Sequence, residues 1–88
     1  MPGIANVLRT VLELSTAHMP CSRPTWGSIR ACDTEYGWIV YIAPGYADIA
    51  PKWLRPIVAL ALEHGCFAIN FDCNGDTVAC FPTYKWEA

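Results

Sequence analysis

The sequence has 88 residues, of which 53% are hydrophobic and only 16% are charged, and its formal net charge is −2. This length predicts a single domain over residues 1–88, and the apolar composition excludes an intrinsically disordered chain. The basic residues are scattered along the chain rather than clustered, so we expect no direct nucleic-acid binding.

The N-terminal residues do not read as a secretory signal, because Arg9 and Glu13 fall where its apolar core would lie. No apolar stretch approaches the ~18 residues that a membrane span requires. The 5 cysteines are an odd number, which argues against a closed set of disulfides. We therefore expect a cytoplasmic protein with reduced thiols and no membrane contact.

The first predicted element is a strand over residues 9–17, where polar and apolar residues alternate. Ile4, Val7 and Leu8 continue with Val11 as a helical stripe, so a helix over residues 4–14 remains an alternative.

The next segment, residues 19–35, is rich in proline and small polar residues and predicts a loop, with a short helical turn near residues 24–29. Aromatic and β-branched residues then dominate residues 36–43, which predicts a mostly buried strand. Pro44 and Gly45 end it.

The clearest helix is predicted from about Lys52 to His64. Pro56 is compatible with it only in the first turn, where backbone N–H groups have no partner within the helix. Gly65 provides the left-handed stop. The apolar residues at helical spacing, which we expect to face the core, are Leu54, Ile57, Val58 and Ala61.

Residues 67–72 alternate again and predict a strand, and Asn74-Gly75 is typical of a two-residue hairpin turn. We therefore expect a returning strand over residues 77–81, ended by Pro82. The predicted fold class is α+β: a small three- or four-stranded, mainly antiparallel sheet with one main helix packed on one face.

Four polar residues are the candidates for chemistry: Ser15, Thr16 and His18 at the end of the first strand, and Asp72 at the end of another. A histidine beside hydroxyls and a carboxylate can act as a general base or bind a ligand. The same residues also satisfy backbone groups at strand ends, and we favour that interpretation.

Metal and cofactor sites are not expected. Cys66, Cys73 and Cys80 recur every seven residues, but zinc sites use pairs two to four residues apart. Residues 72–76 begin like a calcium-binding loop, yet the glycine is at the fourth position and Thr83 stands where the loop needs a bidentate glutamate.

Large aromatics and acids remain as candidate contact residues for a protein partner. They are Tyr36, Trp53, Tyr84 and Trp86 among the aromatics, and Asp48, Asp76 and Glu87 among the acids. Trp53 is at the start of the predicted helix and Trp86 is near the end of the sequence, so we expect one of them to lie on the surface, while core packing is favoured for each aromatic taken singly.

Four short motifs occur in a recognisable order. They are Ser15-Thr16-Ala17-His18, Glu35-Tyr36-Gly37-Trp38, the strand 69–72 that ends in Asp, and the Pro-x-Tyr-x-Trp of residues 82–86. In this respect residues 14–86 resemble a bacterial family of domains of unknown function. The sequence departs from the family pattern between His18 and Tyr36, where it is shorter and rich in proline, which puts a second helix there in doubt.

The resemblance implies no catalytic residues, but it implies a setting in plasmids, phages and other mobile elements. We therefore expect a small non-enzymatic binding protein whose partner is a bacterial protein or protein complex, such as a defence complex inhibited in the anti-CRISPR or anti-restriction manner. Two alternatives stay open. One is a small enzyme or ligand-binding domain centred on His18 and Asp72, and the other is a homodimeric accessory or regulatory module.

Overall fold

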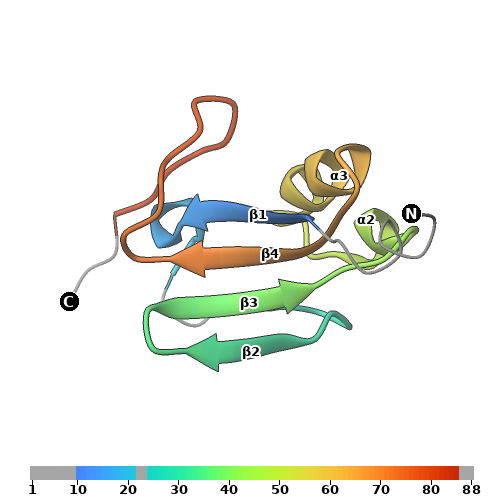
Figure 1. Cartoon of the computed structure of the whole chain (residues 1–88), viewed down its shortest axis with the longest axis horizontal. Helices are drawn as coiled ribbons and strands as arrows, with labels where there is room; N and C mark the ends of the chain where they lie inside the picture. Colours follow the sequence, from blue (N-terminus) through green and yellow to red (C-terminus); the bar gives the residue numbers. More distant parts are fainter. Residues whose placement is uncertain (1–9, 22–23, 86–88) are drawn as a thin grey trace, which may run out of the picture.

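Four strands form one sheet in the order β1-β4-β3-β2 (Figure 1). They are β1 (Thr10–Ser15), β2 (Ala31–Thr34), β3 (Gly37–Tyr41) and β4 (Cys66–Asp72). In this computed structural model, which describes residues 10–21 and 24–85, β1 runs parallel to β4 while β2–β3 and β3–β4 are antiparallel. The expected α+β fold with a mainly antiparallel sheet is confirmed.

One face of the sheet is covered by the helix α3 (Arg55–Glu63). Residues opposite each other on neighbouring strands share a face, so Leu14, Phe71 and Trp38 point to the same side, as do Ile69 and Val40. On the opposite face, register places Glu13, Asn70 and Ile39 side by side, and we call this the open face. The buried core lies between the covered face and α3.

The predicted main helix is confirmed, and so is its core stripe. Leu54, Ile57, Val58 and Ala61 are all buried. Pro56 stands in the first turn, and Leu54 and Arg55 already donate their N–H groups to the Pro51 carbonyl. The helix ends at a left-handed Gly65, with φ of 75°. A further short helix, α2 (Tyr46–Ile49), was not predicted and has no buried residue.

The first predicted strand is confirmed over Thr10–Ser15 and gives way to a short 3-10 helix, η1 (Thr16–His18). Residues 4–9, which belong to the helical alternative, lie outside the described residues.

The prediction of a loop over residues 19–35 is wrong in its last part, because Ala31–Thr34 form β2. Three of its four side chains are exposed, so the sequence lacks the apolar alternation that marks a strand. The helical turn expected near residues 24–29 is replaced by a single tight turn, in which Ile29 N–H donates to the Trp26 carbonyl.

The expected returning strand over residues 77–81 is wrong. The chain does turn at Asn74-Gly75, where the N–H groups of both residues donate to Asp72, one to its side chain and one to its carbonyl. It then leaves β4 and crosses to the end of β1 without regular structure (Figure 1). We call residues 73–85 the closing segment.

Candidate binding site

The closing segment is attached to the motif Ser15-Thr16-Ala17-His18 along its length. Ser15 N–H donates to the Asp76 carbonyl over 2.8 Å, and Tyr84 N–H donates to the Ala17 carbonyl over 2.8 Å. Ser15 Oγ accepts from Ala17 N–H and so caps η1. The hydroxyl and carbonyls at the end of β1 therefore satisfy backbone groups, as favoured from the sequence.

His18 is the centre of this attachment and is 1% exposed. Its Nε2 accepts from Val78 N–H over 2.9 Å, and its Nδ1 lies 2.9 Å from the Pro82 carbonyl oxygen. A carbonyl only accepts, so Nδ1 carries the hydrogen and the imidazole is the neutral Nδ1–H tautomer. The ring also contacts Phe81 edge-on, with centroids 5.8 Å apart.

These bonds bear directly on the alternative of an enzyme or ligand site centred on His18 and Asp72. That alternative requires a partly exposed imidazole with a nitrogen free for a proton or a ligand. Both ring nitrogens are instead engaged by backbone groups of the closing segment, and Asp72 accepts a hydrogen bond from Asn74 N–H over 2.7 Å. The geometry gives His18 a structural role.

Trp53 belongs to the core side of the molecule rather than to a free surface. Its indole N–H donates to the Thr25 carbonyl over 3.0 Å, and its ring packs on Trp26 and Phe71 with centroids 5.3 and 6.0 Å apart. Tyr36 and Tyr84, by contrast, are 52% and 37% exposed. Trp86 and Glu87 lie outside the described residues, and Asp48 is exposed on α2.

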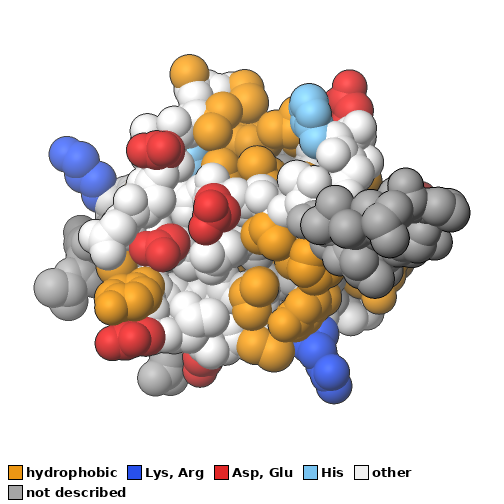
Figure 2. All heavy atoms as spheres, in the orientation of Figure 1, with side chains coloured by type: hydrophobic (Ala, Val, Ile, Leu, Met, Phe, Trp, Pro, Cys, Tyr) orange, Lys and Arg blue, Asp and Glu red, His pale blue; other side chains and the backbone are white. Residues whose placement is uncertain are grey.

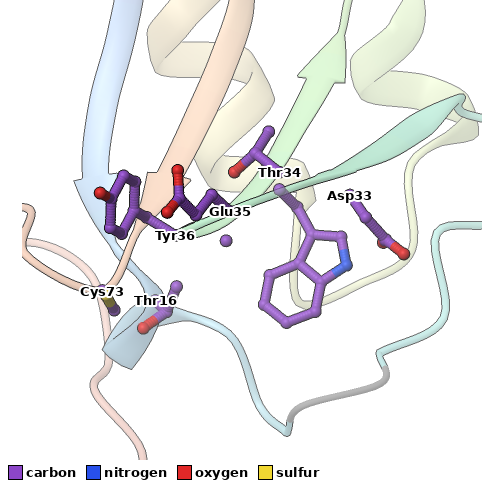
Figure 3. Close-up of a pocket in the computed structure, with 8 residues that line it drawn as sticks. Thr16, Asp33, Thr34, Glu35, Tyr36 and Cys73 are labelled. Carbon is purple, nitrogen blue, oxygen red and sulfur yellow. The ribbon is translucent and has the colours of Figure 1, made fainter.

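A groove opens at the end of the sheet where β3 begins and β4 has just ended. It has a volume of about 440 Å³, and Figure 3 shows the turn residues Glu35 and Tyr36 beside Cys73 and Thr16, with Asp33 on the other side. Gly37, one of the lining residues, lies so close to the neighbouring strand that an added Cβ would clash with the Phe71 carbonyl oxygen. The full lining is Thr16, Asp33, Thr34, Glu35, Tyr36, Gly37, Trp38 and Cys73.

A second, smaller hollow of about 240 Å³ adjoins the groove on the open face. Asp72 lines it and Cys73, the next residue, lines the groove, so the two hollows are neighbours. Its lining is Glu13, Asp72, Asn74, Gly75 and Asp76.

The carboxylates that line these two hollows lie at one end of the sheet, and we call them together the acidic end of the sheet. It comprises Glu13, Asp33, Glu35, Asp72 and Asp76, and none of the described residues lining either hollow is lysine or arginine. By register Glu13 and Asp72 are on the open face, whereas Asp33, opposite Trp38, is on the covered face. Figure 2 shows red side chains spread over the left part of the open face and orange ones gathered over its right part, with blue side chains only at the margins.

The sequence identified part of this site. Thr16, Tyr36, Asp72 and Asp76, four of the predicted binding residues, come together at the acidic end, whereas His18 and Trp53 do not take part. Glu13, Asp33 and Glu35 were not identified from the sequence. Asp33 and Glu35 fall in the segment predicted as a loop, and Glu13 looks like an ordinary solvated residue of the first predicted strand. The register of β2 opposite β3 places Asp33 and Glu35 at the turn end of β3, and the register of β1 beside β4 places Glu13 next to Asn70, two residues before Asp72.

The described residues contain no group of three histidine, cysteine or acidic side chains arranged to hold a metal ion. The segment that begins like a calcium-binding loop forms a turn, in which the N–H groups of Asn74 and Gly75 donate to the side chain and the carbonyl of Asp72. Cys66 is buried in the core, while Cys21, Cys32, Cys73 and Cys80 are exposed free thiols. No helix within residues 10–21 and 24–85 is long and apolar enough to cross a membrane.

These features define a small α+β domain with a helix on one face of a four-stranded mixed sheet and an acidic groove at its end. The chain belongs to the family of unknown function DUF5983, whose C-terminal domain matches residues 11–86. The expected membership in an uncharacterised family is thereby confirmed. No curated protein and no solved structure gives a significant match.

Proposed function

We propose that this protein is a small non-enzymatic binding protein whose acidic end engages a basic surface of a bacterial protein complex. The observation that carries the proposal is the gathering of five carboxylates around two adjoining hollows, from segments far apart in the sequence. Complementary charge of this kind steers association and selects partners.

Tyr36 supplies the apolar anchor that a charged surface alone lacks. It stands at the tip of the β2–β3 turn, is 52% exposed, and lines the groove beside Glu35. A tyrosine offers a large, rigid contact area with a polar tip, which is why tyrosines often dominate binding energy at interfaces.

We extend the proposal to the setting that the family resemblance implies. The chain is then carried by a mobile element or phage, and the complex that it binds is a host defence system inhibited in the anti-CRISPR or anti-restriction manner. Small size and an acidic surface support this extension, because defence nucleases expose basic surfaces to nucleic acid.

The experiment is affinity capture from bacteria that express a defined defence complex, at low and at high salt. The test variant is Glu35→Gln with Asp76→Asn, two exposed acids whose side chains have no hydrogen bond to the described residues. We expect wild type to capture the complex and block its DNA cleavage, and the variant to lose at least about tenfold in affinity from weaker charge pairing.

The matched control is Asp48→Asn with Glu63→Gln, which removes the same charge from the helices. It should bind as wild type does. Tyr36→Ala should weaken binding without altering its dependence on salt. Equal capture by the test and control variants would contradict the role of the acidic end, and an intact nuclease activity in the captured complex would contradict inhibition.

A further inference from the structure

β2 is an edge strand, and no other strand within residues 10–21 and 24–85 pairs with its outer side. It lies last in the sheet order, and Figure 1 shows it at the lower edge of the sheet. An exposed strand edge presents unpaired backbone groups that can pair with a further strand, unless proline, charge or a covering segment prevents it. β2 contains one charged residue, Asp33, and no proline.

The ladder between β2 and β3 shows which backbone groups point outward. Tyr41 N–H donates to the Arg30 carbonyl, which makes Arg30 a residue bonded inward to β3. Bonded and non-bonded residues alternate in an antiparallel pair, so Cys32 and Thr34 are also bonded inward. The N–H and carbonyl groups of Ala31 and Asp33 therefore point to the open edge.

We propose that β2 pairs with β2 of a second copy of this chain, antiparallel, about a two-fold axis that passes beside Cys32. In this register Ala31 of each strand lies opposite Asp33 of the other. Since these are the residues with outward backbone groups, both form hydrogen-bonded pairs. The two sheets then join edge to edge into one continuous sheet.

Symmetry and charge select this register. Paired residues must point to the same face, so a two-fold axis can pass beside a residue but not between two residues. Two symmetric registers neighbour this one. The register centred on Ala31 would pair Asp33 with Ile29, which is buried and whose N–H already donates to the Trp26 carbonyl. The register centred on Asp33 would place its carboxylate directly opposite the same carboxylate of the second copy. Like charges in that position are destabilising. The register centred on Cys32 instead faces Asp33 with Ala31.

The pairing brings the two Cys32 residues together as a non-bonded pair, whose Cα atoms lie about 4.5 Å apart. This falls within the roughly 4.4–6.8 Å that disulfides span. Cys32 is a free, exposed thiol. A disulfide between the two Cys32 residues would therefore report the proposed interface, although the association itself does not require that disulfide.

The first test is oxidation of dilute protein with diamide, which takes two electrons and two protons from two thiols as one disulfide forms. A variant that retains Cys32 while Cys21, Cys73 and Cys80 are serine should become a covalent dimer. Cys32→Ser, with the other thiols kept, should not. Dimers linked equally through the other thiols would overturn the proposal.

The second test measures association of the reduced protein by light scattering over a range of concentrations. Asp33→Pro removes an outward N–H and leaves the bonds to β3 intact, a position where edge strands accept proline. We expect the fold to persist by circular dichroism and the dimer dissociation constant to rise about tenfold or more, since each copy loses a hydrogen bond.

Asp33→Asn is the matched control, because it removes the charge and keeps the N–H. It should dimerise as wild type does, whereas an interface centred on Asp33 would be strengthened by it. A wild-type protein that stays monomeric at every concentration, or one that dimerises equally as Asp33→Pro, would overturn the proposal. Glu35→Gln with Asp76→Asn leaves this edge unchanged, so the outcome is independent of the proposed partner binding.

Discussion

At the scale of single residues, the side chain of His18 joins the end of β1 to the closing segment through three residues of that segment. Its imidazole accepts from the Val78 N–H and donates to the Pro82 carbonyl while its edge contacts Phe81. A segment without regular structure has few internal partners for its backbone groups, and buried backbone groups need partners. His18 provides one acceptor and one donor at fixed positions.

Replacing His18 by phenylalanine should therefore destabilise the fold. The ring volume and the contact with Phe81 are largely kept, but the Val78 N–H and the Pro82 carbonyl lose their partner. We expect the free energy of unfolding to fall by about 1–3 kcal/mol, the typical cost of leaving such groups unpaired. Urea unfolding followed by circular dichroism measures it.

The control is His64→Phe, at the exposed C-terminal end of α3. It should change the free energy of unfolding by no more than about 0.5 kcal/mol. If His18→Phe behaved in the same way, the bonds made by its two ring nitrogens would have no measurable part in stability.

At the scale of elements, the closing segment replaces the hairpin that the sequence favours. It passes over β1 at close range, since a Cβ added to Gly75 would lie 2.6 Å from the Leu14 carbonyl oxygen. It inserts Phe81 into the core, where this side chain is 7% exposed. The segment is thus anchored by one buried aromatic and by hydrogen bonds to the end of β1.

Amide exchange should reveal this anchoring. The N–H groups of Val78, Phe81 and Tyr84 donate within the fold, whereas those of Thr77 and Thr83 have no partner among the described residues. We expect the first three amides to exchange more slowly than the last two, measured by NMR on labelled protein. In His18→Phe, exchange at Val78 should accelerate most; uniform exchange along the segment would contradict the anchoring.

The elements predicted well from sequence are those whose pattern is set by burial. β4 and α3 place apolar residues toward one core at a strand or helix period, so periodicity finds them. β3 was predicted from its aromatic and β-branched residues, and the expectation that it is mostly buried is wrong, because only Val40 of its five residues is buried. β2 is short and three of its four side chains are exposed, and it forms because the turn at Glu35 and Tyr36 returns the chain alongside β3. The closing segment was mispredicted because Asn74-Gly75 specifies a turn but not where the chain goes afterwards.

The candidate site was only partly predictable for a related reason. Its carboxylates come from β1, from β2 and the β2–β3 turn, and from the end of β4 and the start of the closing segment. Each contributes one or two acids that look like ordinary solvated residues in sequence. Only the sheet order, with β4 between β1 and β3, brings them to one end.

At the scale of the whole molecule, the core is built on one side of the sheet, between the covered face and α3. Cys66 is the one cysteine among the buried residues of this core. It begins β4, is 6% exposed, and belongs to the buried cluster with Leu54, Ile57 and Val58 of the α3 side. The register between β1 and β4 shifts by one residue just beyond it, so that Thr10 pairs with Cys66 and Val11 with Ala68.

Thiol reactivity should therefore divide the cysteines into two classes. Cys21, Cys32, Cys73 and Cys80 are exposed and should react at once with a maleimide in the native protein, whereas Cys66 should react only when the core opens. Mass spectrometry of digested protein assigns each labelled site over time.

Denaturant below the unfolding midpoint should accelerate labelling of Cys66 by orders of magnitude. It should leave labelling of the other four cysteines almost unchanged, because only Cys66 depends on the equilibrium between folded and open molecules. Leu54→Ala, which should cost about 2–5 kcal/mol of folding free energy, should accelerate Cys66 labelling in the same way without denaturant. Rapid labelling of Cys66 in the native protein would show that the core between α3 and the sheet is not closed.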